Sequence, residues 1–400
     1  MARVRRSERG PVRHGPVRAQ REAYTDVTAD IRQIETTRGR QRALDQFSPG
    51  TCTLVLDDNA GVYSNLLGST AVPNVAVRIR ALQLGTGDPR FLFTGYVDSW
   101  TPGWTQGQYS DTTITITATD GFKPLQKYKP TPAGNNAIQQ TADARIGAIL
   151  DHAGWPAADR TLDVSTTQIA ATTLTASALD DIQATVLAEQ GRVYMGPDGK
   201  IVFENRNHRL TSARSNTSLD TWESRTNVGF LTFESCSYVY DDTLVQNTIS
   251  AQRSGGVLIT AQDATSVADN FEDDVQQTSL LLTTDDDVQA WADWQLYLNK
   301  NAEQRFESIT VRPLVQGTSD YVNKVIDYLI SDRLTVIVYP PRGNPISQVS
   351  YIEGIDHTIT TEPQDWTVTF HLSSAAQTQN MLVFDDPNLG KLDSGTFARW

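Results

Sequence analysis

Five histidines are the first candidates for chemistry in this 400-residue sequence. They are His14, His152, His208, His357 and His371. No two of them stand in the HExxH spacing that places two zinc ligands on one helical face, and the sequence has no GxSxG, Walker A or Rossmann motif. His357 and His371 are predicted to lie on one hairpin beside Glu353 and Asp356. A metal site and ordinary solvent-facing strand positions are the two interpretations of this hairpin.

Two acidic runs resemble cation sites only in part. Residues 57–61 read Asp-Asp-Asn-Ala-Gly, like the start of a calcium loop, but the later acidic ligand of an EF-hand is missing. The triplet 285–287 is Asp-Asp-Asp, which could bind a metal or could begin a helix, where negative charge is favourable. We expect a turn at the first run and a helix start at the second. We therefore predict no metal and no other cofactor.

The two cysteines and the aromatic residues are expected to serve packing. Cys52 and Cys236 belong to no CxxC pair, so we predict that they are reduced and structural, with a disulfide between them as the alternative. Eight tryptophans and thirteen tyrosines could form a sugar-binding platform, but most fall in predicted strands and helices. The motifs thus predict a protein without an enzymatic active site.

The charge of the chain is unevenly distributed. Residues 1–21 contain seven arginines and one glutamate, which gives this segment a net charge of +6. Because the whole chain has a net charge of −13, the remaining residues have a net charge of −19. We predict that residues 1–22 form an extended arm that binds a partner, either an acidic groove of a neighbouring subunit or nucleic acid; a frayed terminus is the alternative. The candidate partner-binding residues are Arg3, Arg5, Arg6, Arg9, Arg13, Arg18 and Arg21.

The acidic remainder of the chain argues against binding of nucleic acid by the bulk surface. Such an acidic surface would allow DNA to move past the protein without binding to it, although acidic surfaces also keep proteins soluble. No run of about 18 apolar residues is present, so we expect no membrane-spanning segment. The first residues show no apolar h-region, so we expect no Sec signal peptide.

Period-two patterns predict the strands of a first β domain. Residues 113–119 alternate Thr with Ile114, Ile116 and Ala118, which is typical of a half-buried strand. Further strands are predicted at 25–36, 51–57, 75–84 and 91–100, and the stretch 123–136, with three prolines, is predicted to be a linker.

The pattern then changes twice along the chain. Helices are predicted from Ile138 to Ala153 and from Ser177 to Gly191, with Ser177 and Asp180 as a helix cap, and residues 192–204 form a hairpin. Strands at 230–242 and 244–253 follow, joined by a turn and followed by a polar stretch. A helix at 285–301, a strand at 307–313, a helix at 321–330 and strands at 333–339, 349–358 and 366–372 complete the prediction.

The predicted fold class is mainly β with α+β insertions, in which tube-like β-barrels alternate with smaller α+β domains. The predicted division is an arm at 1–22, a first β-barrel-like domain at 23–130, a small α+β domain at 131–225, the first part of a second β domain at 226–284, a helix-containing part that completes the second barrel at 285–375, and an extension at 376–400.

An ordered set of segments resembles the minor tail proteins of siphophages that infect actinobacteria. The segments are YTDVTADIRQIETTRGRQRALDQFSPGTCTLVLDD, LFTGYVDSW, TITATDGFKPL, ILDHAGWPAADRTLD, GPDGKIVFENR and ISQVSYIEGIDHTITTEPQDWTVTFHLS. They cover the chain from about residue 24 to 375. Residues 59–74 depart from the family, which usually has a longer stretch rich in Asn and Pro there, so the resemblance implies nothing about the contacts of this loop.

The resemblance implies a baseplate hub at the tail tip, with two tube-like barrels, two smaller domains and usually a ring of three. The implied partners are other copies of the chain, the distal tail protein, the tape-measure protein and other minor tail or tip proteins, with DNA passing without specific binding. The implied location is the virion tail tip, assembled in the host cytoplasm. The implied role is to link the tail tube to the tip in host attachment and DNA ejection. A carbohydrate-binding adhesin of the tail and a cell-wall hydrolase are the alternatives, although no C-terminal lectin or peptidase module is recognisable.

Because no nucleophile–base pair or acid–base pair is visible, we expect the purified chain to release no product from peptidoglycan or glycans. Release of reducing ends or peptides would be measured against a known wall hydrolase as positive control. Turnover that disappears when one specific carboxylate is mutated would contradict the prediction.

Overall fold

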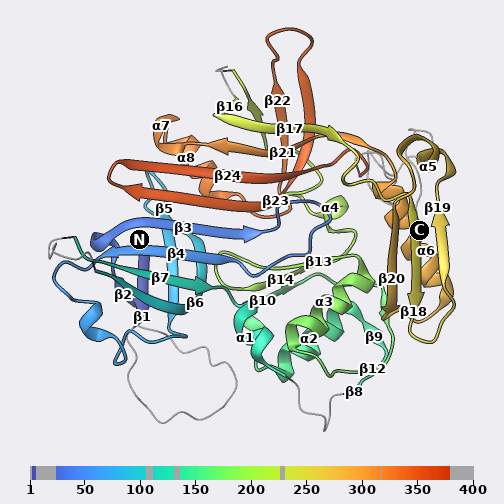
Figure 1. The fold of residues 1–400 in the computed structure, drawn as a ribbon, viewed down its shortest axis with the longest axis horizontal. Helices are drawn as coiled ribbons and strands as arrows, with labels where there is room; N and C mark the ends of the chain where they lie inside the picture. The colour runs from blue at the N-terminus through green and yellow to red at the C-terminus, as the bar shows by residue number, and fades with distance from the viewer. Residues whose placement is uncertain are drawn as a thin grey trace.

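The structure is a computed structural model that describes residues 2–5, 24–104, 111–129, 136–225, 230–316 and 318–378. Most of the predicted arm and extension lie outside these ranges. Figure 1 shows one large sheet that occupies the left and upper part of the molecule, with an α+β unit below it and a three-stranded unit at the right edge. No helix in the described part of the chain has the length and hydropathy needed to cross a membrane.

One half of the large sheet is antiparallel and comes from the N-terminal part of the chain. Its order is β3-β4-β7-β6-β5-β1-β2. The strands are β1 (Ala2–Arg5), β2 (Tyr24–Asp26), β3 (Ile31–Gly39), β4 (Thr51–Asp57), β5 (Ala76–Leu82), β6 (Pro89–Gly103) and β7 (Thr113–Thr119). The alternation predicted for β7 is confirmed: Ile114, Ile116 and Ala118 are buried and lie opposite Leu56, Leu54 and Cys52 of β4.

The other half of the large sheet comes from the C-terminal part of the chain. Its strands are β15 (Asp220–Glu223), β16 (Leu231–Thr232), β17 (Ser235–Asp241), β21 (Glu303–Val311), β22 (Arg333–Val338), β23 (Ile346–Thr361) and β24 (Gln364–Ser374). The predicted last hairpin is confirmed as β23 and β24. β23 also pairs with β3, so one 14-stranded sheet runs through both halves.

The fold is mainly β with small helical insertions, as predicted, but the tube-like barrels are not found as closed rings. A barrel closes only when its first and last strands pair. Among the described strands, β2 and β16 are the two ends of the sheet, and β17 is the end of its side branch. These three terminal strands do not pair with one another. The two halves therefore form one branched sheet, joined through β3 and β23.

The α+β unit confirms several predicted elements. It contains α1 (Phe122–Lys127), α2 (Ala142–His152), α3 (Ala178–Glu189), α4 (His208–Thr211), and a sheet of β10 (Arg160–Leu162), β13 (Arg192–Met195) and β14 (Ile201–Glu204). The Ser177 hydroxyl accepts the backbone N–H of Asp180, so the predicted cap of α3 is correct. The predicted linker is wrong at α1, because Pro124 is tolerated in the first turn of a helix. The helix predicted to begin at Ile138 begins instead at Ala142, and Ile138 precedes it and is 72% exposed.

Short elements connect these parts. They are 3-10 turns at Thr28–Asp30, Ser64–Leu66 and Ala157–Asp159, the two-residue strands β8 (Asn136–Ala137), β9 (Gln140–Thr141), β11 (Gln168–Ile169) and β12 (Thr172–Thr173), and the helices α7 (Pro313–Gln316) and α8 (Ser319–Asp327). The predicted helix at 321–330 corresponds to α8, which begins after Thr318 and packs Val322, Val325 and Ile326 into the core.

The three-stranded unit differs from the predicted domain division. It contains β18 (Thr248–Arg253), β19 (Ile259–Gln262), α5 (Ala264–Asn270), β20 (Asp274–Leu280) and α6 (Asp285–Asn299). Residues 226–284 were assigned to the second barrel, yet only β16 and β17 join the large sheet, while β18–β20 form a separate sheet. Val288, Trp291 and Ala292 of α6 belong to the same core as β18, so burial of this helix requires β18 to leave the large sheet.

The arm prediction needs correction at its first residues. β1 (Ala2–Arg5) lies antiparallel between β5 and β2 of the same chain. The edge of β5 offers unpaired backbone groups, and β1 satisfies them. Arg3 and Arg5 therefore lie in the chain's own sheet, whereas the arginines at 6, 9, 13, 18 and 21 lie outside the described residues.

Two glycines allow β3 and β23 to meet. Gly39 and Gly354 are direct partners in the register of these strands. A Cβ on Gly39, which has φ +91°, would lie 2.2 Å from the Glu353 carbonyl oxygen, and a Cβ on Gly354 would lie 2.6 Å from the Arg40 carbonyl oxygen. The approach of the two halves therefore leaves no room for a side chain at either position.

We expect Gly39→Ala or Gly354→Ala to lower the free energy of unfolding by about 1–3 kcal/mol or more, because backbone must move to admit the methyl group. Urea unfolding followed by circular dichroism measures this. Gly147→Ala is the matched control: it lies inside α2, its nearest neighbour would be Leu162 Cδ1 at 3.9 Å, and a gain of about 0.5–1 kcal/mol is expected. Equal unfolding midpoints for all three variants would contradict the close approach.

Candidate functional site: an arginine-lined pocket

The carboxylate of Glu353 lies at the centre of the most unusual charge cluster in the described residues. The register between β23 and β24 shifts between Ile352 and Gly354, so Glu353 is the extra residue of a bulge. Its side chain is fully buried. Arg40 Nε donates to Glu353 Oε2 at 2.8 Å, and Arg209 Nη1 donates to Glu353 Oε1 at 2.7 Å. One carboxylate thus connects the large sheet to α4.

Serine and tyrosine side chains complete this cluster. Ser373 Oγ donates to Glu353 Oε1 at 2.5 Å. Glu204, a second buried carboxylate, accepts hydrogen bonds from Ser331 Oγ and Tyr194 OH, both at 2.6 Å. The hydroxyl and guanidinium donors satisfy both carboxylates, as buried charges require.

The pKa of Glu353 is set by two opposing effects. Burial by itself raises the pKa of this carboxyl, but the guanidinium groups of Arg209 and Arg40 outweigh it and hold the pKa well below its ordinary value. Glu353 is therefore ionised at neutral pH and cannot serve as a general acid.

Arg192 lies near the same carboxylate but lacks a direct partner. It begins β13, and its buried Nε and Nη1 atoms have no hydrogen-bond acceptor among the described residues. Burial, reinforced by the neighbouring charge of Arg209, lowers the pKa of Arg192 to about 10. The Nη2 atom of Arg209 likewise has no acceptor in the part of the chain that the structure describes. The cluster therefore holds buried guanidinium donors that no described acceptor satisfies.

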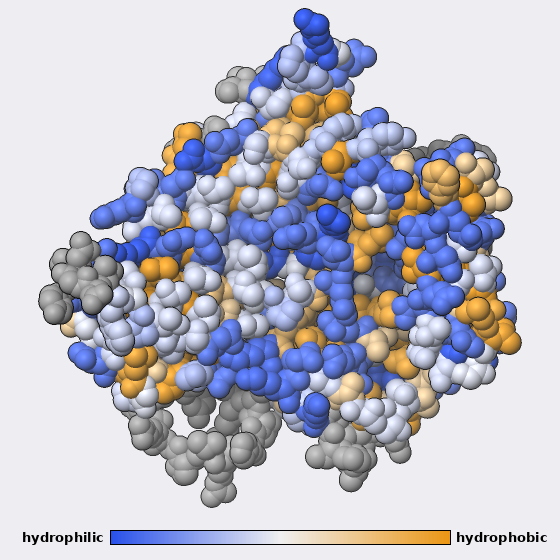
Figure 2. Space-filling view, in the orientation of Figure 1, coloured by the Kyte–Doolittle hydropathy of each residue, from blue (hydrophilic) through white to orange (hydrophobic). Residues whose placement is uncertain are grey.

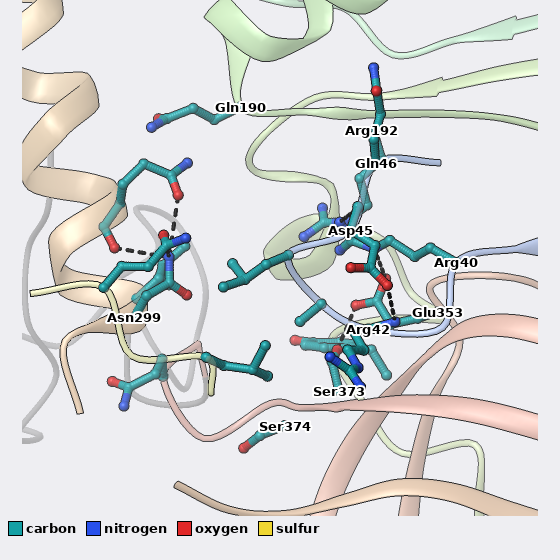
Figure 3. Close-up of a pocket in the computed structure, with 18 of the residues that line it drawn as sticks. Arg40, Arg42, Asp45, Gln46, Gln190, Arg192, Asn299, Glu353, Ser373 and Ser374 are labelled. Carbon is teal, nitrogen blue, oxygen red and sulfur yellow. Dashed lines mark hydrogen bonds and ion pairs between the residues drawn. The ribbon is translucent and has the colours of Figure 1, made fainter. Parts of the chain in front are cut away.

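These groups line a pocket of about 700 Å³ where the large sheet, the α+β unit and the three-stranded unit meet. Figure 2 shows the surface hollowed between the large sheet and the three-stranded unit. In Figure 3, Arg40, Glu353 and Ser373 lie on one side of the open space and Asn299, at the end of α6, lies on the other. Half-buried apolar side chains complete the walls: Leu44, Leu210, Leu244, Trp294 and Leu298.

Two further acidic residues of the pocket lining are also paired. Arg305 binds Asp241 at 2.9 Å and Glu307 at 3.1 Å. Asp45, Asp180 and Glu303 also line the pocket and accept hydrogen bonds, from Arg42 N, Ser177 Oγ and Gln377 Nε2 respectively. The lining thus combines guanidinium groups and carboxylates with half-buried apolar side chains.

The sequence analysis did not find this pocket. Arg40, Arg192, Arg209 and Glu353 are spread over more than 300 positions of the chain and belong to no spaced motif. Of the predicted site residues, the arginines of the arm, only Arg3 and Arg5 fall within the described residues, in β1, and the others lie outside them. Two local features of the sequence are consistent with the pocket once the structure is known. One is the basic turn after β3, and the other is the pair Glu353-Gly354 within a strand that is otherwise rich in β-branched residues.

The two histidines of the last hairpin do not converge on a metal. His357 is buried and accepts a hydrogen bond from Trp366 Nε1 at 3.3 Å, and burial together with the charge of Arg38 lowers the pKa of His357 to about 3. His371 Nε2 lies 2.8 Å from Asp356 Oδ2. Within the described ranges no group of three or more His, Cys, Asp or Glu side chains could hold a metal ion.

The other acidic candidates have structural contacts. Asp58 accepts the backbone N–H groups of Tyr63 and Ser64, so the run at 57–61 is a turn, as expected. Thr284 and Asp287 form a capping box at the start of α6, which confirms the helix start predicted for the Asp triplet. Cys52 and Cys236 are both free thiols.

An exposed aromatic row, the feature that would favour the adhesin alternative, is not found in the described part of the chain. Trp104 is the only described tryptophan that is strongly exposed, at 71%. The other described tryptophans are buried or half-buried; they are Trp100, Trp155, Trp222, Trp291, Trp294 and Trp366.

Comparison with solved structures gives the same architecture in phage-related proteins. A tail protein from Neisseria meningitidis MC58 superposes with a TM-score of 0.62 at 13% sequence identity, covering 94% of this chain and 98% of that one. The 43 kDa tail protein of prophage MuSo2 from Shewanella oneidensis gives a TM-score of 0.58 at 12% identity, covering 94% and 99%. The chain shares their fold. No family model and no curated protein matches the sequence.

We expect Glu353→Gln to lower the free energy of unfolding at neutral pH by about 3–5 kcal/mol, because it leaves buried guanidinium groups without their counter-charge. Asp365→Asn is the control, since it removes an acidic partner from the more exposed Arg312 and should change stability little. Comparable losses for the two variants would show that Glu353 is not the central partner.

The cost of Glu353→Gln should also depend on pH. The folded pKa of Glu353 is depressed, so its contribution is present above the unfolded value of about 4.3 and is lost as pH falls below it. We expect the difference in unfolding free energy between wild type and Glu353→Gln to be smaller at pH 3 than at pH 7. Urea titrations at both pH values measure this difference, and one that grows toward low pH would contradict the assignment.

Proposed function

We propose that this chain is a structural protein of a phage tail. The observation that carries the proposal is the shared fold over nearly the whole chain: each comparison covers 94% of this chain and 98% or 99% of the tail protein. Fold similarity alone does not define function, so the proposal also rests on the chemistry of the site. There the buried carboxylate of Glu353 is paired with Arg40 and Arg209, which keep it ionised, so it cannot act as a general acid.

Within the tail, the proposed position is the hub at the tip, where a ring links the tail tube to the distal tip proteins. The proposed partners are the distal tail protein, the tape-measure protein and other tip proteins. The net charge of −13 supports a surface that DNA passes without specific binding during ejection. Siphophages of actinobacteria are the proposed origin, on the segments that resemble their minor tail proteins.

The free edges of the large sheet support assembly into a ring. β17 pairs only with β21, and β16 pairs only with β15, so each leaves one edge open among the described strands. Open edges promote association with another strand. Tyr240 lies on β17 and is 68% exposed, so the edge also presents apolar surface. Subunits that pair edges around a rotation axis close into a ring.

We expect the purified chain to form a threefold ring in solution, measured by mass photometry. Tyr240→Asp places charge on the edge strand and should shift the population toward monomers, whereas Phe271→Asp, at another exposed position outside the large sheet, should not. A chain that stays monomeric under all conditions would contradict the ring. A sixfold ring would instead favour the role of the distal tail protein.

The role itself is tested in the virion. A cryo-EM map of intact tails should show density for this fold at the tip, and phage that lack the gene should fail to complete tails. Infectious particles without the chain would contradict a structural role. Bound host glycan with unchanged tail assembly would favour the adhesin alternative.

A further inference from the structure

One face of the large sheet carries hydroxyl side chains in continuous rows across the strands. Residues that are partners in register lie on the same face of a sheet, so the pairings trace each row from strand to strand. One row runs through β6, β7, β4, β3, β23 and β24 as Ser99, Thr117, Thr53, Glu35, Thr358 and Thr367. The next row includes Thr51, Thr37, Asp356 and Thr369, and reaches β21 and β17 at Thr310 and Ser235. We call the surface formed by these two rows the hydroxyl face.

The opposite face of the same strands is the core. Ile116, Leu54 and Ile34 alternate with the hydroxyl residues along β7, β4 and β3 and are buried. The helix α8 contributes Val322 and Val325 to this core. In Figure 1 no helix is drawn in front of β24, β23, β3, β4 and β7, and Figure 2 shows pale, weakly polar side chains over the large sheet. Among the described elements, the hydroxyl face is therefore the side of the sheet that is open to solvent.

The side chains of the hydroxyl face bond mainly to one another. Thr37 Oγ1 and Thr51 Oγ1 share a hydrogen bond of 2.8 Å across β3 and β4, and Ser99 Oγ and Thr117 Oγ1 share one of 2.8 Å across β6 and β7. Cross-strand hydroxyl pairs of this kind stabilise a sheet.

The few carboxylates of the hydroxyl face also have partners. Glu35 Oε1 accepts a hydrogen bond from Gln33 Nε2 at 2.6 Å, and Asp356 Oδ2 lies 2.8 Å from His371 Nε2. None of the positions that define the two rows is Lys or Arg. The face is therefore polar and composed mostly of short side chains, with little negative charge and without a cation in its rows.

This chemistry fits a wall along which duplex DNA moves without binding. Lys and Arg side chains bind phosphate groups and release counterions, which gives a protein its affinity for any DNA sequence. A dense carboxylate surface would instead repel the duplex. Short hydroxyl side chains that already bond to one another provide neither strong attraction nor strong repulsion. They also project little from the sheet, so they offer few obstacles to a moving duplex.

We propose that the hydroxyl face lines the channel of the ring and is the surface past which duplex DNA moves. This inference rests on the proposed ring and adds which surface of the chain points inward. The strand β17, with its open edge, is also the last strand of the hydroxyl face, so pairing at this edge would continue the face from one copy to the next. The α+β unit and the three-stranded unit then lie outside the channel.

The reactivity of single thiols toward reagents of two sizes tests the proposal. Thr358→Cys places a thiol on the hydroxyl face, and Thr161→Cys on β10 of the α+β unit is the matched control, because both threonines are exposed strand residues. Both are made with Cys236→Ser, since Cys236 is half-buried and Cys52 is buried. In the ring we expect the two thiols to react at similar rates with N-ethylmaleimide. With a maleimide coupled to serum albumin, which is too large for a channel, we expect Thr358→Cys to react at least tenfold more slowly.

Mass photometry of the same samples separates this inference from the ring itself. A ring in which both thiols react equally with the large reagent would leave the ring intact and overturn the inward placement of the hydroxyl face. A ring in which only Thr161→Cys is shielded would place the α+β unit inside and would overturn it as well. A chain that stays monomeric has no channel, so the proposed ring and this inference would then fail together.

A lysine on the hydroxyl face tests its role toward DNA. Phage that carry Thr358→Lys should complete their tails but deliver DNA into host cells at least tenfold more slowly than wild type, because each copy adds a cation to the wall. Thr161→Lys is the matched control and should deliver DNA at the wild-type rate. Equal delivery by the two variants would overturn the proposal. Tails that fail to complete only with Thr358→Lys would assign the face to a contact with another tail protein, which also overturns it.

Discussion

The buried carboxylate of Glu353 is the constraint on which the arrangement of the units depends. A charge removed from water is costly unless it is paired and hydrogen-bonded, and here the partners come from separate parts of the chain. Arg40 follows β3, Arg209 belongs to α4, and Ser373 lies at the end of β24. If any of these parts moves away, the carboxylate is left buried without its donors. The relative position of the sheet and the α+β unit is therefore determined by electrostatics as well as by apolar packing.

Backbone geometry makes this arrangement possible. The bulge in β23 takes Glu353 out of the regular pairing of β23 with β24. The glycines at 39 and 354 allow β3 and β23 to approach closely, and the backbone N–H of Arg40 donates to the Glu353 carbonyl oxygen at 3.0 Å. The same contacts leave Arg192 close to the carboxylate without a direct bond. A structural ion-pair cluster and a pocket with spare guanidinium donors thus arise from one feature of the fold.

A structural role agrees with the physical chemistry of the whole molecule. Fold similarity at 12–13% identity means that few side chains are shared with the two tail proteins, so the common architecture depends on burial patterns rather than on particular residues. In this chain the described tryptophans mostly fill cores, and the Glu353 carboxylate at the pocket pairs with Arg40 and Arg209. The surfaces left for partners are the free sheet edges and the terminal segments.

The sequence by itself determined the elements that depend on near neighbours. The alternation of β7, the Ser177 cap of α3, the hairpin of β13 and β14, and the capping box of α6 were all readable, because strand period and helix capping act within a few residues. The sequence did not reveal β1 on the edge of β5, the separate sheet of β18–β20, or the open branched sheet in place of barrels. Arg40 and Glu353 are 313 residues apart, and their pairing has no local signal. Only the tertiary structure decided the pocket, because its charges are brought together by strand register and by glycine contacts between distant segments.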